Sequence, residues 1–228
     1  MINEQELDIL EKQRQKNSDW VITRLNLLSI LSSYGEVKVV GAKALGLMVA
    51  KDIDISVLVD TVSVKDWQKL VGKLMETPYV RNISAIDYYN YDEHNHYSPT
   101  DGQKYSLYVS INNIMGPEED KFDTWECQIH LIERTKFDES KVVDVKKQLT
   151  PEKRLTILRV KHWADQLNKI LMSKTNKNFK IFSRSIYHAV LEKNVDSVTS
   201  FIQDYTPTVP ENFKETFQLA LNQIGSTN

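Results

Sequence analysis

The stretch Val39–Val59, which reads VVGAKALGLMVAKDIDISVLV, decides how this chain folds. The stretch begins within a valine-rich segment over residues 36–42, which is predicted to be a short strand. A short turn and helix follow over 43–51. A second strand follows over 52–60, where apolar side chains occupy every other position. Such alternation is typical of a strand with one buried face. The stretch therefore predicts a strand, a tight turn, a short helix and a second strand in succession.

Two aspartates open the second strand of this unit. Asp52 and Asp54 are two residues apart, so both carboxylates project from one face of the strand while Ile53 turns to the other. Neighbouring carboxylates repel each other unless a positive charge lies between them. Mg²⁺ prefers oxygen ligands and keeps coordination positions open for phosphates, and a pair of such ions can serve both oxygens of a phosphoryl transfer. The pair predicts a magnesium site.

The end of the first strand supplies a second element. Gly41 lies where the backbone turns into a helix, and such a turn offers free N–H groups to a phosphate. The strand, Gly41-Ala42, nine further residues and then Asp-Ile-Asp resemble the signature of the DNA polymerase β-like nucleotidyltransferase superfamily, including its small, antibiotic-modifying type. Ala42 departs from the usual serine of that signature, which leaves only its backbone to hold a triphosphate.

The resemblance implies an α+β fold, with a polymerase β-like mixed sheet flanked by helices and followed by a C-terminal helical domain. It implies transfer of a nucleoside monophosphate from a nucleoside triphosphate, with ATP as the expected donor, to an acceptor hydroxyl. Pyrophosphate would be released in a two-metal reaction. Asp52 and Asp54 would bind Mg²⁺, while Gly41, Ala42 and Lys43 would cradle the triphosphate.

A third carboxylate is expected from a later strand, where the superfamily uses it to bind metal and to take the proton of the acceptor. Strands are predicted over 80–91, 104–112 and 125–133, and the last one places Glu126, Gln128 and His130 on one face. Gln128 occupies the position where several members carry an aspartate. Either Glu126 completes the catalytic and metal-binding set with Asp52 and Asp54, or the third carboxylate is missing. His130 is either part of this site or a hydrogen-bonded core residue.

The second half of the chain lacks strand patterns and predicts helices over 151–172, 179–192, 196–205 and 210–224. We therefore expect a catalytic domain over 1–145 and a helical domain over 146–228. The segment TILRVKHW resembles a helix of the 2′-5′-oligoadenylate synthetases and their bacterial relatives, which implies that Lys161 contacts the triphosphate. Alternatively, Lys161 is a solvated lysine paired with Asp165, and Trp163 is ordinary packing.

The N-terminal stretch predicts helix up to about residue 33, with a break over 16–19 where Ser18 could cap a second helix. This polar, charged start does not read as a secretory signal, and no segment is apolar enough to span a membrane. The single cysteine, Cys127, permits no internal disulfide, so we expect a cytoplasmic protein without a membrane partner.

The formal net charge of −2 indicates that long nucleic acid is not the partner, whereas a nucleotide needs only a few local cations and a metal. The expected acceptor is a small molecule, such as an antibiotic, or a protein. Two alternatives remain open. One is a catalytically degenerate relative that binds a nucleotide or a partner protein, and the other is a component of a toxin–antitoxin pair.

Overall fold

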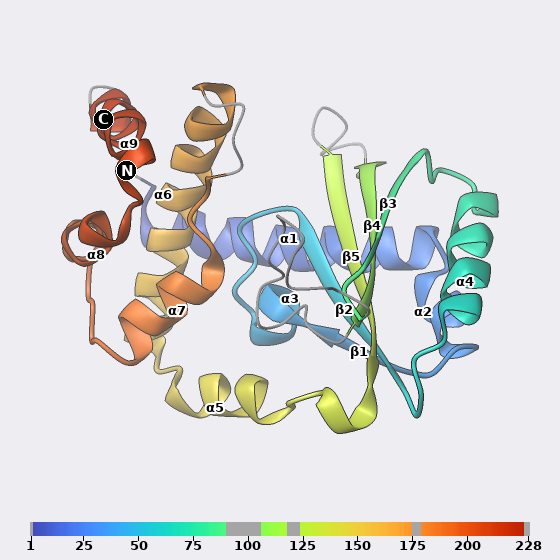
Figure 1. Cartoon of the computed structure of the whole chain (residues 1–228). Coiled ribbons are helices and arrows are strands. Elements are labelled where there is room, and N and C mark those ends of the chain that lie inside the picture. Colours follow the sequence, from blue (N-terminus) through green and yellow to red (C-terminus); the bar gives the residue numbers. More distant parts are fainter. Residues whose placement is uncertain (1, 90–105, 118–123, 175–178, 226–228) are drawn as a thin grey trace. The chain divides into compact units, whose positions relative to one another are not determined.

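A computed structural model describes residues 2–89, 106–117, 124–174 and 179–225 (Figure 1). The chain forms two compact units, one of residues Gln13–Val143 and one that combines Met1–Lys12 with Asp144–Asn228. The expected single domain over 1–145 differs from this division, because the first residues of the chain belong with the helical unit. None of the described helices is long and apolar enough to cross a membrane.

One mixed sheet forms the centre of the first unit. Within the described residues it contains β1 (Glu36–Val40), β2 (Asp52–Val59), β3 (Asn82–Asp87), β4 (Ser106–Met115) and β5 (Thr124–Glu133). The strand order is β1-β2-β5-β4-β3, and β2 runs parallel to β5 while the other neighbours are antiparallel. The predicted mixed sheet is confirmed, and β2 and β5 lie beside each other within it.

Helices cover the apolar face of this sheet. The second half of α1 (Glu4–Arg24) contributes Val21 and Ile22 to this core, and α2 (Leu27–Ser32) and α4 (Val64–Glu76) pack leucines against β2, β4 and β5 (Figure 1). Ile53, Ile55 and Ile129 are fully buried in this core. Because side chains alternate along a strand, burial of this face leaves the opposite face of β2 and β5 for Asp52, Asp54 and Glu126. A short helix, α3 (Gly41–Leu45), joins β1 to the loop before β2.

The predicted helix break at residues 16–19 is wrong, since α1 is continuous. Ser18 is fully buried, and its hydroxyl donates to the Gln15 carbonyl at 2.6 Å instead of capping a new helix. A serine inside a helix can satisfy its hydroxyl in this way without breaking the backbone ladder. The chain turns later, at Asn26, whose φ of 52° lies in the left-handed region that asparagine tolerates.

The helical unit contains most of α5 (Ser140–Gln148), α6 (Pro151–Lys174), α7 (Ser183–Leu191), α8 (Val198–Tyr205) and α9 (Glu211–Gly225). Single turns of 3₁₀ helix lie at Arg134–Lys136, in the sheet unit, and Thr206–Thr208, in the helical unit. The start of α1 joins this unit because Leu7 is buried and Arg154 donates to the carboxylates of Asp8 and Glu11 at 3.5 and 3.3 Å. The sequence could not show that one helix serves two units.

Candidate functional site

The turn at Gly41 lies directly against the carboxylate of Asp54. Val40, the last residue of β1, is the cross-strand partner of Asp54, and Gly41 then takes a φ of 62°. A Cβ atom at position 41 would lie 2.0 Å from Oδ2 of Asp54. Only glycine both adopts this backbone conformation readily and leaves room for the carboxylate. The glycine therefore shapes the place where Asp54 sits.

The parallel pairing of β2 with β5 aligns the carboxylates. Asp52 is the register partner of Glu126, and Asp54 is the partner of Gln128. Partners across a sheet share one face, so Glu126 lies beside Asp52 and the neutral amide lies beside Asp54. A backbone hydrogen bond of 2.9 Å from the Glu126 amide to the Lys51 carbonyl fixes this register at the start of β2. The structure thus brings Asp52, Asp54 and Glu126 to one region of one face.

The electrostatic effect of this face reaches the core behind it. Cys127 is fully buried on the opposite side of β5. Burial raises the pKa of its thiol, and the negative charges of Asp54 and Glu126 raise that pKa further. Two carboxylates on different strands therefore both act on the Cys127 thiol.

The donor chemistry of these side chains fits Mg²⁺, which takes carboxylate oxygens as ligands. Asp52, Asp54 and Glu126 supply such oxygens from adjacent strand positions. No group of three or more His, Cys, Asp or Glu side chains in the described part of the chain is close enough to form a complete metal site. The three carboxylates therefore have the chemistry of Mg²⁺ ligands and lie at neighbouring strand positions.

Ala42 and Lys43, which were both expected to cradle a phosphate, have different surroundings in the structure. Ala42 is buried, so its methyl group belongs to the core and only its backbone can face a ligand. The Lys43 ammonium lies 2.7 Å from both the Ser18 hydroxyl and the Asp19 carboxylate, and its side chain is only 11% exposed. The structure therefore differs from the expectation for Lys43, whose charge ties α3 to α1.

Among the comparisons with known proteins, the one with solved structures finds similar proteins. No family model matches the sequence, and no curated protein matches it. Solved structures do. The chain is similar to a mutant of the Cid1 poly(U) polymerase bound to MgATP, with 16% identity, 78% of this chain and 50% of that chain covered, and a TM-score of 0.53. The MgGTP-bound enzyme gives 15% identity, the same coverage and a TM-score of 0.52.

A third Cid1 structure, from work on its RNA terminal uridylyl transferase activity, gives 16% identity and a TM-score of 0.51 over 79% of this chain and 46% of that chain. The chain has the polymerase β-like nucleotidyltransferase fold. At this level of identity the likeness establishes the fold alone, and the chain spans about half the length of the structures it matches. The expected α+β class is thereby confirmed.

Another group on the carboxylate-bearing face of the nucleotidyltransferase fold is His130. Its Nδ1 lies 3.2 Å from the Ser106 hydroxyl, and its ring centroid is 5.0 Å from that of Tyr108. Burial lowers the pKa of His130 to about 4, so the ring is neutral near pH 7. Of the two interpretations of His130, the structure supports the hydrogen bond, while the ring lies half-buried on the carboxylate-bearing face and not in the core.

Lys161 of α6 is buried, with 6% of its surface exposed. Its ammonium lies 3.3 Å from the Tyr187 hydroxyl and 5.5 Å from the centre of that ring. The alternative of a solvated Lys161–Asp165 pair is wrong, because Asp165 pairs with Lys169 at 2.9 Å. Among the described residues no carboxylate forms an ion pair with Lys161. A buried cation without a counter-charge is costly, and a bound anion would offset that cost.

Trp163 packs within the helical unit, edge to face with Phe201 at a centroid distance of 6.0 Å. This contact supports the interpretation of Trp163 as a packing residue.

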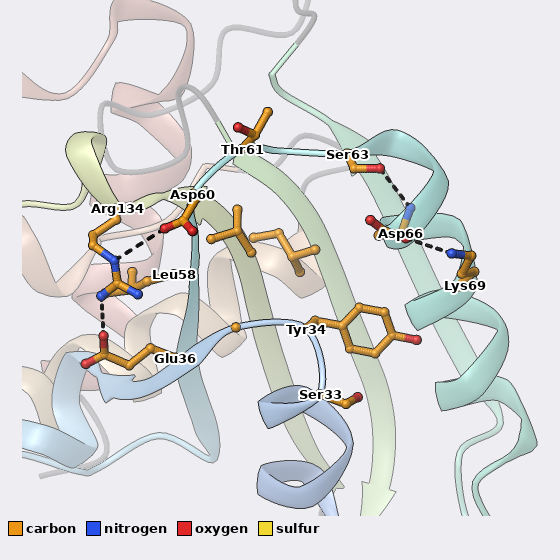
Figure 2. Close-up of a pocket in the computed structure, with 13 residues that line it drawn as sticks. Ser33, Tyr34, Glu36, Leu58, Asp60, Thr61, Ser63, Asp66, Lys69 and Arg134 are labelled. Atoms are coloured by element: carbon orange, nitrogen blue, oxygen red, sulfur yellow. Dashed lines mark hydrogen bonds and ion pairs between the residues drawn. The ribbon is translucent and has the colours of Figure 1, made fainter.

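A separate hollow of about 660 Å³ lies at the other end of β2 from Asp52, where β2 ends and α4 begins (Figure 2). Its charged side chains are paired with one another. Arg134 forms ion pairs with Glu36 and Asp60, and Lys69 pairs with Asp66 at 2.8 Å. Because these charges already satisfy each other, the hollow presents no unpaired charge that would select a ligand, and the candidate site remains the carboxylate-bearing face.

Proposed function

We propose that this chain is a Mg²⁺-dependent nucleotidyltransferase. It would transfer a nucleoside monophosphate from a nucleoside triphosphate to an acceptor hydroxyl. The observation that carries the proposal is the fit of Gly41 against Asp54 next to the aligned pair of Asp52 and Glu126. The fold shared with Cid1 structures bound to MgATP and MgGTP supports it.

Each residue has a distinct part in the proposed reaction. Asp52, Asp54 and Glu126 would hold Mg²⁺, which supplies charge neutralisation and polarises the reacting phosphate. The backbone N–H groups of Gly41 and Ala42 would bind phosphate oxygens. The acceptor oxygen bonds to the α-phosphorus while the bond from that phosphorus to the bridging oxygen breaks. Pyrophosphate leaves with the electron pair, and Glu126 takes the hydroxyl proton.

A separate proposal concerns Lys161 of the helical unit, which would bind a phosphate group because its buried charge lacks an anionic partner among the described residues. A charged hydrogen bond of this kind contributes about 1.5–3 kcal/mol. Lys161→Met should therefore weaken nucleotide binding by about 10- to 100-fold. Lys169→Met is the matched control, since it removes an exposed lysine of the same helix that is paired with Asp165.

Calorimetric titration with ATP, GTP, CTP and UTP, with and without Mg²⁺, tests the proposal. Wild type should bind at least one nucleotide in a metal-dependent manner, and the Asp52→Asn/Asp54→Asn double variant should lose that binding. Asp60→Asn is the control, because it neutralises an exposed carboxylate that follows the same strand. No binding of any nucleotide to folded wild type would refute the proposal.

The proposed acceptor is a small molecule or a protein, and ATP is the proposed donor. Cid1 has RNA terminal uridylyl transferase activity. Pyrophosphate release should therefore be measured without acceptor, with RNA oligonucleotides and with panels of hydroxylated small molecules and proteins. Stimulation by RNA alone would overturn the proposed acceptor class. A catalytically inactive nucleotide-binding protein is the second candidate, favoured by the absence of a side-chain phosphate donor at Ala42.

A further inference from the structure

A buried serine on the neighbouring strand holds the carboxylate of Glu126. Ser110 of β4 is 3% exposed, and its hydroxyl donates to Oε1 of Glu126 at 2.8 Å. Ser110 is the register partner of Gln128, so it stands on the same face of the sheet as the carboxylates. The contact occupies one oxygen of Glu126 and leaves Oε2 for other interactions.

A bulge in β4 follows directly after Ser110. The pairing of β4 with β5 shifts register between Ile111 and Ile114, and Asn113 takes a left-handed φ of 58°. Such bulges re-aim side chains and are frequent beside active sites. Here the bulge brings Oδ1 of Asn112 to 3.0 Å from the Ser110 hydroxyl, and the Asn112 amide donates to the Ser110 carbonyl at 3.4 Å.

The single hydroxyl proton of Ser110 faces two acceptors. Oε1 of Glu126 is the nearer one, and a carboxylate accepts more strongly than an amide oxygen. When this proton is donated to Glu126, Ser110 restrains the Glu126 carboxylate, and Asn112 stays attached to the same residue through its amide hydrogen bond to the Ser110 carbonyl. A glutamate has one more rotatable bond than the aspartates of β2, so it needs such a restraint more than they do.

We infer that Ser110, which precedes the bulge at Asn112 and Asn113, is a positioning residue that presents Oε2 of Glu126 to the catalytic metal. The inference rests on the proposed function. Groups that hydrogen-bond to metal ligands fix the ligand orientation, and their removal typically costs about 10- to 100-fold in metal affinity. Ser110→Ala should lower metal affinity by about that factor.

The experiment measures Mn²⁺ binding by the loss of the free-ion electron paramagnetic resonance signal, in the presence of a non-hydrolysable ATP analogue. Ser110→Thr keeps the hydroxyl and should retain most of the affinity. Ser106→Ala is the matched control, because it removes an equally buried hydroxyl on the same face of β4 that contacts His130 instead. If Ser110→Ala does not fold, Ser110→Cys, which has a weaker donor, should show an intermediate loss.

The outcomes separate the two proposals. Wild type that binds neither Mn²⁺ nor nucleotide would refute the proposed function itself. Wild type that binds both, with equal Mn²⁺ affinity in Ser110→Ala, would overturn only the positioning role. Equal losses in Ser110→Ala and Ser106→Ala would overturn it as well, since they would reflect general damage to the sheet.

Discussion

Replacement of Gly41 by alanine tests the central feature of the site. The added Cβ would lie 2.0 Å from Oδ2 and 2.9 Å from Cγ of Asp54. It would also place an L-residue at a φ of 62°, a conformation that costs roughly 1–2 kcal/mol. The Asp54 carboxylate must rotate away, and a displaced rotamer costs about 0.5–1.5 kcal/mol. Gly41→Ala should therefore lower the free energy of unfolding by about 1.5–3.5 kcal/mol.

Urea unfolding measures this loss, and a second variant divides it. In an Asp54→Ala background the closest atoms are gone, so the cost of Gly41→Ala should fall to the backbone component. The coupling free energy between the two positions should be about 0.5–1.5 kcal/mol. Gly72→Ala is the control, because its Cβ meets nothing within 4 Å, and this helical change should stabilise by about 0.8–1 kcal/mol.

Metal-dependent nucleotide binding by the Gly41→Ala variant tests whether the glycine turn also serves the site. Gly41→Ala should weaken it at least about 10-fold, because the displaced Asp54 is a proposed metal ligand. A cost of Gly41→Ala that is unchanged by Asp54→Ala would refute the steric reasoning. Unaltered nucleotide binding in a destabilised Gly41→Ala variant would show that the turn supports the fold and not the site.

Two further predictions concern charges near the site. The pKa of His130 is lowered from about 6.5 in the unfolded chain to about 4, so its contribution to stability is present above pH 6.5 and is lost as the pH falls toward 4. His130→Gln should reduce this loss of stability at acid pH, as measured by urea unfolding from pH 7 to 4. Parallel curves of stability against pH for the variant and wild type would contradict the prediction. Lys43→Met should cost about 1–3 kcal/mol, because it removes charged hydrogen bonds from a largely buried ammonium to the buried Ser18 and the exposed Asp19. Lys69→Met removes an exposed ion pair and should cost about 0–1 kcal/mol. Equal shifts of the two variants in thermal unfolding would disprove the structural role of Lys43.

Local patterns in the sequence were sufficient to predict the strands that carry the site. Alternation over β2 and β5 identified which residues face the core, and the structure confirms it with Ile53 and Ile129 buried and Asp52 and Glu126 half-buried. A period of two residues leaves no other way to bury one face of a strand. The positive φ at Gly41 likewise follows from a glycine at the end of a strand that turns at once into a helix.

Contacts between distant segments could not be obtained in this way. The lysine at position 43 follows the glycine turn, and only its packing against α1 shows that Ser18 and Asp19 take its charge. Two adjacent asparagines at 112 and 113 were a possible signal for the bulge, since asparagine tolerates the left-handed region, but the partner of Ser110 depends on strand order.

The arrangement of β2 and β5 is difficult to explain by stability alone. These strands lie inside the sheet, where a covered face would ordinarily favour β-branched or aromatic side chains. Instead the chain places Asp52 and Asp54 on one strand and Glu126 in register on the next, and it uses a conformationally costly glycine to make room for one of them. Local violations of folding rules that occur together are expected at functional sites. A divalent cation with a triphosphate would offset the repulsion among the carboxylates, which is why we place the function of the chain on this face.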